Sequence, residues 1–458
     1  MKSWKCNRDT MLTEKRPPAS APRPYRFPAF ERGTLPNGSR LIVCPIPKLP
    51  LATLMAVTNA GAGKDPNGRE GTARLTAKLL VEGTRRWSGA QLAEQFEGIG
   101  TSLDSGADWD SATARVTFLT EHFDRVSELL GEVLLGPTFP ERELQRLKSE
   151  RVADLLQIES EPRGLADEAF ESFLYTADSR FSIPSGGSKS SVPAISLGDV
   201  TAFHAQTYTP ENTTFIVAGD LQYGRVYKKF CSALADWTRR SSAADTRPNA
   251  VAGSRRRGKL IEKADAPQSE LRIGHAGLPR KNPDYFPVVV MNAILGGLFG
   301  SRINLNLREA HGYTYGASSY FDWRKDVGPF VISTAVATEV TGAALKEVFL
   351  EIDKIREERV SAAELSLARD YLDGVFPIRY ETTAAVASAL SNLVVQELDV
   401  DYFDSYRERI RAVSAEDVLN AARDHLHPNK LQTLVVGNVS AVREQLAELE
   451  VGELADAT

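Results

Sequence analysis

Residues 196–220 read SLGDVTAFHAQTYTPENTTFIVAGD, and a similar stretch occurs further along the chain. Residues 414–438 read SAEDVLNAARDHLHPNKLQTLVVGN, and the two stretches align without gaps at a constant offset of 218 residues. Each copy begins with S-x-x-D, which is typical of the start of a helix, and continues through a proline turn into an apolar strand that ends at glycine. The repeat therefore predicts two halves with the same fold.

The similarity extends upstream of both copies. In each half a strand-like run precedes an amphipathic helix, and a second helix start follows; these segments are 112–119, 123–135 and 140–156 in the first half and 329–337, 341–355 and 361–375 in the second. Ser361 and Glu364 fit a capping box. We therefore predict an α+β fold of two homologous domains, each a mostly antiparallel sheet with helices packed on it.

The composition of the remaining segments sets the expected boundaries. Residues 1–27 are polar, basic and proline-rich, which indicates a disordered leader, and residues 238–258 are polar and irregular, which indicates a linker. The last residues, VGELADAT, are expected to fray. The predicted organisation is a leader (1–27), a first domain (28–237), a linker (238–258), a second domain (259–450) and a tail (451–458).

The overall composition is that of an ordinary globular protein. A net charge of −5 over 458 residues argues against a dominant nucleic-acid-binding face, and three widely spaced cysteines support neither a disulfide scaffold nor a cysteine metal site. No apolar run approaches the ~20 residues that a membrane span needs. The leader lacks the apolar core of a secretory signal, so we expect a cytoplasmic protein, or a periplasmic one if the start site is misassigned.

Common catalytic motifs are missing from the sequence. None of the six histidines belongs to H-E-x-x-H or H-x-x-E-H, the helical spacings that direct two imidazoles at one zinc ion. There is no G-x-S-x-G nucleophile elbow, and His425 and His427 beside a proline turn are expected at the surface. The chain alone therefore offers no self-sufficient catalytic constellation.

One segment of the second half is distinctive: LGGLFGSRINLNLREAHGYTYGASSYF (295–321). Ser301 is predicted to cap a helix that runs to about His311 and ends at Gly312. The following run, 313–321, reads as a strand with Tyr313 and Tyr315 on one face. From the pattern alone, Arg308 would serve the helix C-terminus and the tyrosines would pack on the sheet.

This segment resembles the second domain of the insulinase/pitrilysin family of zinc peptidases, which includes the mitochondrial processing peptidases. The resemblance is carried by the LGG turn, Ser301-Arg302, Leu307-Arg308-Glu309, Gly312 and Tyr315. It continues through GVFPIRYETTAAVASAL (374–390) and covers most of the first half, including GTARLTAKLLVEGT (71–84). It implies the two-domain fold of that family.

The family's zinc motif, a pattern like G-x-A-H-x-x-E-H-x-x-x-x-G-T, falls on residues 71–84. Gly71, Ala73, Gly83 and Thr84 match it. The two histidine ligands fall on Arg74 and Lys78, and the glutamate base falls on Ala77. The acidic third ligand would fall near Asp154. Two cations would repel Zn²⁺, so we expect no metal or other cofactor in this chain.

The second half keeps what the first half lacks. In the family, an arginine and a tyrosine seven residues later reach from the second domain to hold the substrate backbone and stabilise the oxyanion, and Arg308 and Tyr315 have that spacing. Tyr313, Gly296 and Gly297 are expected near the substrate, and His311 is an outside candidate. Gly296 and Gly297 are expected to form a flexible turn ahead of the helix.

The resemblance implies a division of labour between two chains. This chain would be the non-catalytic subunit of a heterodimeric zinc endopeptidase, inactive alone, with zinc held by a homologous partner and with peptides or unfolded segments as substrates. Arg308 and Tyr315 would complete the partner's site in trans. The alternative is a proteolytically dead structural or interaction protein of the same fold. A homodimer stays open, and an autonomous peptidase is the least favoured hypothesis.

Overall fold

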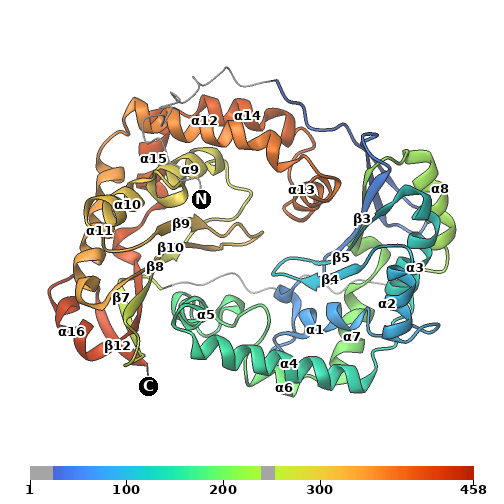
Figure 1. The fold of residues 1–458 in the computed structure, drawn as a ribbon, viewed down its shortest axis with the longest axis horizontal. Coiled ribbons are helices and arrows are strands. Elements are labelled where there is room, and N and C mark those ends of the chain that lie inside the picture. The colour runs from blue at the N-terminus through green and yellow to red at the C-terminus, as the bar shows by residue number, and fades with distance from the viewer. Residues whose placement is uncertain (1–23, 239–252, 458) are drawn as a thin grey trace, which may run out of the picture.

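The computed structural model describes residues 24–238 and 253–457 and contains two six-stranded mixed sheets with helices around them (Figure 1). The first sheet has the order β1-β2-β6-β3-β5-β4, and the second has the order β12-β7-β11-β8-β10-β9. The predicted α+β architecture is confirmed. Most neighbouring strands are antiparallel, and β2–β6, β7–β11 and β7–β12 are parallel.

The first half contains six strands and eight α-helices among the described residues. The strands are β1 (Glu31–Thr34), β2 (Arg40–Pro45), β3 (Leu51–Thr58), β4 (Leu103–Ala107), β5 (Ala112–Leu119) and β6 (Thr213–Gly219). The helices are α1 (Thr72–Leu79), α2 (Gly89–Glu97), α3 (Phe123–Leu135), α4 (Glu141–Ser160), α5 (Pro162–Leu174), α6 (Ser191–Ala194), α7 (Leu197–Thr207) and α8 (Tyr223–Ala233).

The second half has a similar order in its described residues, except that its last strand, β12, takes the sheet place that β1 has in the first half. Its strands are β7 (Arg257–Glu262), β8 (Gln268–Ala276), β9 (Ala317–Phe321), β10 (Pro329–Ala337), β11 (Gln432–Gly437) and β12 (Glu453–Ala457). Its α-helices are α9 (Tyr285–Asn292), α10 (Arg302–Asn304), α11 (Thr341–Glu357), α12 (Ala362–Arg379), α13 (Thr383–Val395), α14 (Tyr402–Ala412), α15 (Ala415–His425) and α16 (Val439–Ala447). Two π-helical turns follow α9 and α10: η5 (Ala293–Gly297) and η6 (Leu305–Ala310).

The predicted repeat is present in the backbone. Ser196 with Asp199, and Ser414 with Asp417, form capping boxes at the starts of α7 and α15. Strands β6 and β11, which end the two copies, occupy the same third place in their sheets. The predicted capping box of Ser361 also forms, at the start of α12. The two halves therefore fold alike because equivalent residues start and end equivalent elements.

Each half contributes one helix to the other half's sheet. Helix α5, from the first half, packs on β8 and β11, whereas α13, from the second half, packs on β3 and β6. Figure 1 shows this exchange: the green α5 lies beside the second sheet, and the red-orange α13 lies beside β3. Consequently one hydrophobic cluster joins residues of both halves, such as Met55 and Ile216 with Leu390.

The structure corrects three expected boundaries. Residues 1–23 of the expected leader lie outside the described residues, but Tyr25 and Phe27 pack against the second half, and the Phe27 ring stacks on Phe403 with 4.0 Å between centroids. Of the expected linker, 239–252 lie outside the described residues, and Arg257 already begins β7. The expected frayed tail contains β12, which pairs with β7 because that sheet edge offers free backbone groups.

A helical stretch in the second half is long and apolar enough to cross a membrane by length and composition. It spans Tyr285–Ala310, and 56% of its most apolar window is buried inside the protein. Within the described residues it is the one stretch that meets these criteria. Its buried side chains, including Val288, Met291 and Leu307, belong to the second half's core, as expected for the core helix of a globular domain.

Candidate functional site

The N-terminus of α1 is held tightly in place. Gly71 precedes the helix with φ +102°, a left-handed conformation that favours glycine, and a Cβ there would lie 3.0 Å from the carbonyl oxygen of Gly186. The Asp65 carboxylate accepts hydrogen bonds of 2.7 Å from the backbone N–H groups of Gly71 and Ala73. Arg180 pairs with Asp65 at 3.0 Å, and both side chains are buried. These contacts give the matched motif residues structural roles.

The positions that would hold zinc in the family lie on α1 as the sequence predicts. Ala77 is fully buried at 0% exposure, and its carbonyl oxygen accepts a 2.7 Å hydrogen bond from Ser105 Oγ. Arg74 is half-buried and Lys78 is exposed. Within the described residues, neither of these two side chains has a hydrogen bond or an ion pair. The helix therefore presents two cations and a methyl group where zinc chemistry needs imidazoles and a carboxylate.

Helix α4 places a third cation beside this site. Burial, followed by the charge of Arg74, lowers the pKa of the Arg151 guanidinium. Arg151 Nη2 lies 3.4 Å from Glu168 Oε1. The negative charge of Asp154 raises the pKa of Arg151, whereas the positive charge of Arg74 lowers it. Sequence reasoning identified Asp154 but missed Arg151, because the contact between α1 and α4 is tertiary.

These residues do not fit a zinc ion. In the described parts of the chain, no group of three or more histidine, cysteine, aspartate or glutamate side chains is arranged to hold a metal. Arg74, Lys78 and Arg151 supply positive charge, and the exposed Asp154 is the one carboxylate at the predicted ligand positions. A Zn²⁺ ion here would face repulsion without a compensating ligand set.

The predicted helix and turn of the second half differ from expectation. Gly296 and Gly297 belong to the π-helical turn η5 rather than to a flexible turn. Gly296 packs so closely on β9 that a Cβ would lie 2.5 Å from Ser319 Oγ, so its lack of a side chain has a packing reason. Ser301 occupies the N-cap position of α10, but its side chain makes no capping hydrogen bond and is buried without a partner among the described residues.

Arg308 and Tyr315 both lie at the surface. The Arg308 side chain, 35% exposed, lies in η6, where its Nε is 3.3 Å from Glu309 Oε1 and its Cζ is 4.3 Å from the centre of the Phe299 ring. Tyr315 is 94% exposed. Gly312, with φ +66°, ends the helical turn as predicted, and its N–H donates to the Arg308 carbonyl oxygen.

The predicted strand 313–321 is shorter in the structure. Strand β9 begins at Ala317, because Thr314 and Gly316 form a local turn in which the Thr314 hydroxyl donates to the Gly316 carbonyl oxygen. Tyr313 and Tyr315 therefore do not share a strand face. Tyr313 packs against the second half's core and stacks on His311 with 5.0 Å between ring centroids.

A cavity of about 370 Å³ lies between the two halves. Its walls come from α5, including Asp167 and Glu171, and from the second sheet, including Arg272 and Tyr320. Arg272 pairs with Asp167 at 2.6 Å. Arg308, Tyr315, Arg74 and Lys78 are not among its lining residues, so this cavity does not unite the two predicted sites.

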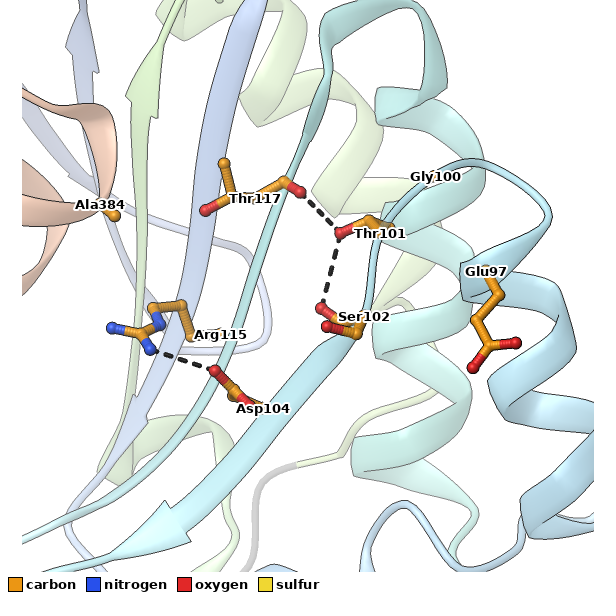
Figure 2. Close-up of a pocket in the computed structure, with 8 residues that line it drawn as sticks. All are labelled: Glu97, Gly100, Thr101, Ser102, Asp104, Arg115, Thr117 and Ala384. Carbon is orange, nitrogen blue, oxygen red and sulfur yellow. Dashed lines mark hydrogen bonds and ion pairs between the residues drawn. The ribbon is translucent and has the colours of Figure 1, made fainter.

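A second, shallower cavity of about 600 Å³ lies beside edge strand β4. Figure 2 shows its polar side chains, of which Arg115 pairs with Asp104 at 3.1 Å and Thr101 Oγ1 donates to the Thr117 carbonyl oxygen at 2.6 Å. Ala384, near the start of α13, forms part of its rim.

The histidines expected at the surface are instead partly buried. His425 Nε2 lies 2.8 Å from Asp284 Oδ2, and the His427 N–H donates to His275 Nε2 at 3.1 Å. The His275 side chain is buried, and burial lowers its pKa to about 3. The sequence did not predict the contact between His275 and His427, because β8 and the end of α15 are distant in the chain and come together only in the folded domain.

The comparisons with known proteins agree with this geometry. Residues 47–180 match the family model described as Insulinase (Peptidase family M16), and residues 194–372 match the one described as Peptidase M16 inactive domain. A Helicobacter pylori protein named "Non-peptidase homolog YmxG" is 24% identical over 85% of this chain and 90% of its own length. A Bacillus subtilis protein named "Uncharacterized zinc protease YmxG" is 20% identical over 77% of this chain and 85% of its own.

Solved structures share the fold over nearly the whole chain. A structure described as a peptidase M16 inactive domain from Pseudomonas fluorescens superposes with a TM-score of 0.83 at 27% identity, covering 89% of this chain and 98% of that one. A chain of Complex III2 from Candida albicans superposes with a TM-score of 0.75 at 15% identity, covering 91% and 98%. The two family models match most of the chain, and the solved structures share its two-domain fold. This chain is therefore a member of the insulinase family, peptidase family M16.

Proposed function

We propose that this chain is a non-catalytic subunit that completes, in trans, the active site of a zinc-bearing member of the same family. Arg308 and Tyr315 are the residues that it would contribute. The partner would hold the zinc ion and the general base, which the residues of α1 here do not provide. The single observation that carries the proposal is a contrast between two places in the chain. The zinc-motif positions of α1 carry cations and a methyl group, whereas the half-buried Arg308 and the exposed Tyr315 keep the family's donors.

The chemistry of the two side chains supports this role. A guanidinium and a phenol O–H are hydrogen-bond donors suited to a carbonyl oxygen that gains negative charge. Tyr315, at 94% exposure, leaves nearly its whole ring in water, which is an unusual position for a large aromatic side chain in a subunit that acts alone. Burial of that ring against a second chain would remove apolar surface from water and place the hydroxyl in a drier site.

The comparisons are compatible with an assembly. One relative bears the name "Non-peptidase homolog", and one structure of the same fold is a chain of Complex III2. The substrate class that fits is a peptide or an unfolded segment. An extended peptide can add to a free sheet edge, and β4 and β9 are edge strands of their sheets.

The test begins with native cells. Affinity capture of this chain followed by mass spectrometry should recover a homologue that carries H-x-x-E-H, and co-expression of the two chains should yield a stable complex. The complex should cleave an internally quenched peptide, whereas this chain alone should not. Arg308→Ala or Tyr315→Phe should lower kcat on the order of 10²- to 10³-fold, because each removes a donor to the reacting oxygen.

Two controls separate catalysis from assembly. Size-exclusion chromatography should show that the complexes with Arg308→Ala and Tyr315→Phe form as well as the unaltered one. Tyr227→Phe should leave cleavage unchanged, because Tyr227 lies on α8 and belongs to neither predicted site. If Arg308→Ala and Tyr315→Phe complexes retain full activity, the role in trans is wrong, and a proteolytically inert interaction role is favoured instead.

A further inference from the structure

A cavity of about 650 Å³ lies in the second half, beneath the exchanged helix α13. This volume is typical of small-molecule sites. One face of α13 lines it with Ala385, Ser388, Ala389 and Asn392, at helical spacing, and Gln396 lines it directly after the helix ends. The opposite wall comes from the loop before α9, from the end of β9 and from the ends of α12 and α14. We call this cavity the α13 pocket.

The α13 pocket contains a buried cation that lacks an anion. Arg280 is 8% exposed, and its guanidinium has no hydrogen bond or ion pair with any described residue. Its Cζ lies 3.4 Å from the centre of the Tyr285 ring and 5.0 Å from that of Tyr402. The Arg280 backbone N–H donates to the Arg324 carbonyl oxygen at 2.8 Å, which fixes the loop. The two tyrosine rings stabilise the guanidinium by cation–π contacts but supply no negative charge, so this position favours a bound anion.

The other charges of the pocket reinforce that preference. Arg379, at the end of α12, also lines it and has no ion pair among the described residues. The one carboxylate in the lining, Asp322, is already paired with Arg324 at 2.6 Å. Two guanidinium groups therefore face the cavity without a free carboxylate between them.

The walls favour an aromatic ligand. Tyr285, Trp323, Tyr380, Tyr402 and Phe403 line the pocket, and Tyr285 packs against Trp323 with 4.6 Å between ring centroids. Gln396 adds a polar group: its Oε1 is buried and has no hydrogen-bond partner in the described structure. Aromatic walls, unpaired guanidinium groups and an unsatisfied acceptor are complementary to a ring that carries both an anion and a donor.

We propose that the α13 pocket binds a carboxylate attached to an aromatic ring, with the carboxylate at Arg280 and Arg379 and the ring among the tyrosines and Trp323. Two sources supply this chemistry: a free aromatic acid, or the C-terminal aromatic residue of a peptide. A hydroxyl or N–H on the ligand would satisfy Gln396. Because the other face of α13 packs on the first sheet, the bound ligand would also strengthen the contact between the halves.

The experiment uses the full chain and calorimetric titration. The probes are 4-hydroxyphenylacetate, the uncharged 4-hydroxyphenylacetamide, and the peptide Gly-Gly-Tyr with a free or an amidated C-terminus. We expect at least one of the two carboxylates to bind and its amide to bind on the order of 10- to 100-fold more weakly, since a charge-assisted hydrogen bond is lost. Binding of the free acid alone identifies a small metabolite site, and binding of the peptide identifies a C-terminus site.

Variants locate the site. Arg280→Met should abolish binding of the carboxylates while leaving the unliganded chain folded, with a single melting transition, because methionine keeps an apolar contact with Tyr285 in place of the cation–π contact. Arg379→Gln, at an exposed position, should weaken binding several-fold without affecting folding. The neighbouring exposed Lys281→Gln should bind as the unaltered chain does.

The proposal is wrong if no carboxylate probe binds at millimolar concentration, if amides bind equally well, or if Arg379→Gln and Arg280→Met both bind normally.

Discussion

Helices α5 and α13 occupy equivalent places in the two halves, yet they attach to the opposite sheet in different ways. Helix α5 brings charge to the contact: Asp167 pairs with Arg272, and Glu171 pairs with Arg324, each at 2.6 Å. Helix α13 brings small and aliphatic side chains, and its polar contact is the 2.9 Å hydrogen bond between the hydroxyls of Thr383 and Thr53. Duplication preserved the position of the helix and left the chemistry of its contact free to diverge.

The same divergence occurs at the end of the central strands. Strand register makes Thr58 of β3 and His275 of β8 equivalent. Thr58 lies opposite Ala112, and His275 lies opposite Phe330; Ala112 and Phe330 are separated by the 218-residue offset of the repeat. Thr58 forms a 3.0 Å hydrogen bond with the hydroxyl of Thr213, whereas His275 bridges the Ala276 carbonyl oxygen and the His427 N–H. One half thus has a titratable group where the other has none.

The largest effect is expected at the apolar contact. Leu390 is fully buried. It lies two helical turns after Thr383, on the same face of α13, and Thr383 contacts Thr53 of the first sheet. Leu390→Ala should lower the free energy of unfolding by about 3 kcal/mol, through lost burial and the cavity left behind. Urea denaturation measures it, with the exposed Leu367→Ala on α12 as the control. A cost below that of Leu367→Ala would contradict the apolar character of this contact.

A somewhat smaller effect is expected at the charged contact. The Arg324 side chain is almost fully buried, pairs with Glu171 and Asp322, and lies over the rings of Trp109 and Phe181. Arg324→Ala should cost about 2 to 3 kcal/mol, because it leaves the Glu171 carboxylate, which keeps some access to water, without a cation.

The neighbouring residue supplies the control for Arg324→Ala. Lys325 pairs with Glu397, whose side chain is mostly exposed, so Lys325→Ala should cost less than about 1 kcal/mol. A second variant, Glu171→Gln combined with Arg324→Ala, should recover part of the loss. Equal costs for Arg324→Ala and Lys325→Ala would show that burial of the α5 ion pair is unimportant.

The smallest effect is expected from His275 and depends on pH. Its pKa of about 3 in the folded chain lies below the value of about 6.5 in the unfolded chain, so the unfolded chain binds the extra proton as pH falls. The contribution of neutral His275 is present above pH 6.5 and is lost between pH 6.5 and 3, by about 2 kcal/mol at pH 5.

Urea unfolding at pH 7.5 and pH 5 tests this difference. His275→Asn should reduce the loss of stability between the two pH values by about 2 kcal/mol, because the variant removes the titrating group. Thr58→Val, at the equivalent place in the first half, should leave the pH dependence unchanged. An unaltered pH dependence in His275→Asn would assign the acid sensitivity to another group.

Part of the site was predictable from the sequence because it depends on local patterns. The helix that carries Arg74, Ala77 and Lys78 follows from its spacing, and Gly312 ends the turn after Arg308 as glycine commonly does. The strand containing Tyr313 and Tyr315 was wrong because the Thr314 hydroxyl forms a local turn. A glycine pair predicts a turn at Gly296 and Gly297, but its pattern carries no information on the close packing of Gly296 against Ser319.

The sequence by itself determined the doubled α+β architecture, since the 218-residue repeat carries its own capping boxes and strand ends, and it determined that α1 presents cations in place of zinc ligands. Only the tertiary structure decided that α5 and α13 exchange sheets, that Arg151 joins Arg74, and that Arg280 lies buried without a counter-ion among aromatic rings. The physical reason is that capping and periodicity act within about one helix or strand, whereas burial and charge pairing depend on residues that are distant in the chain.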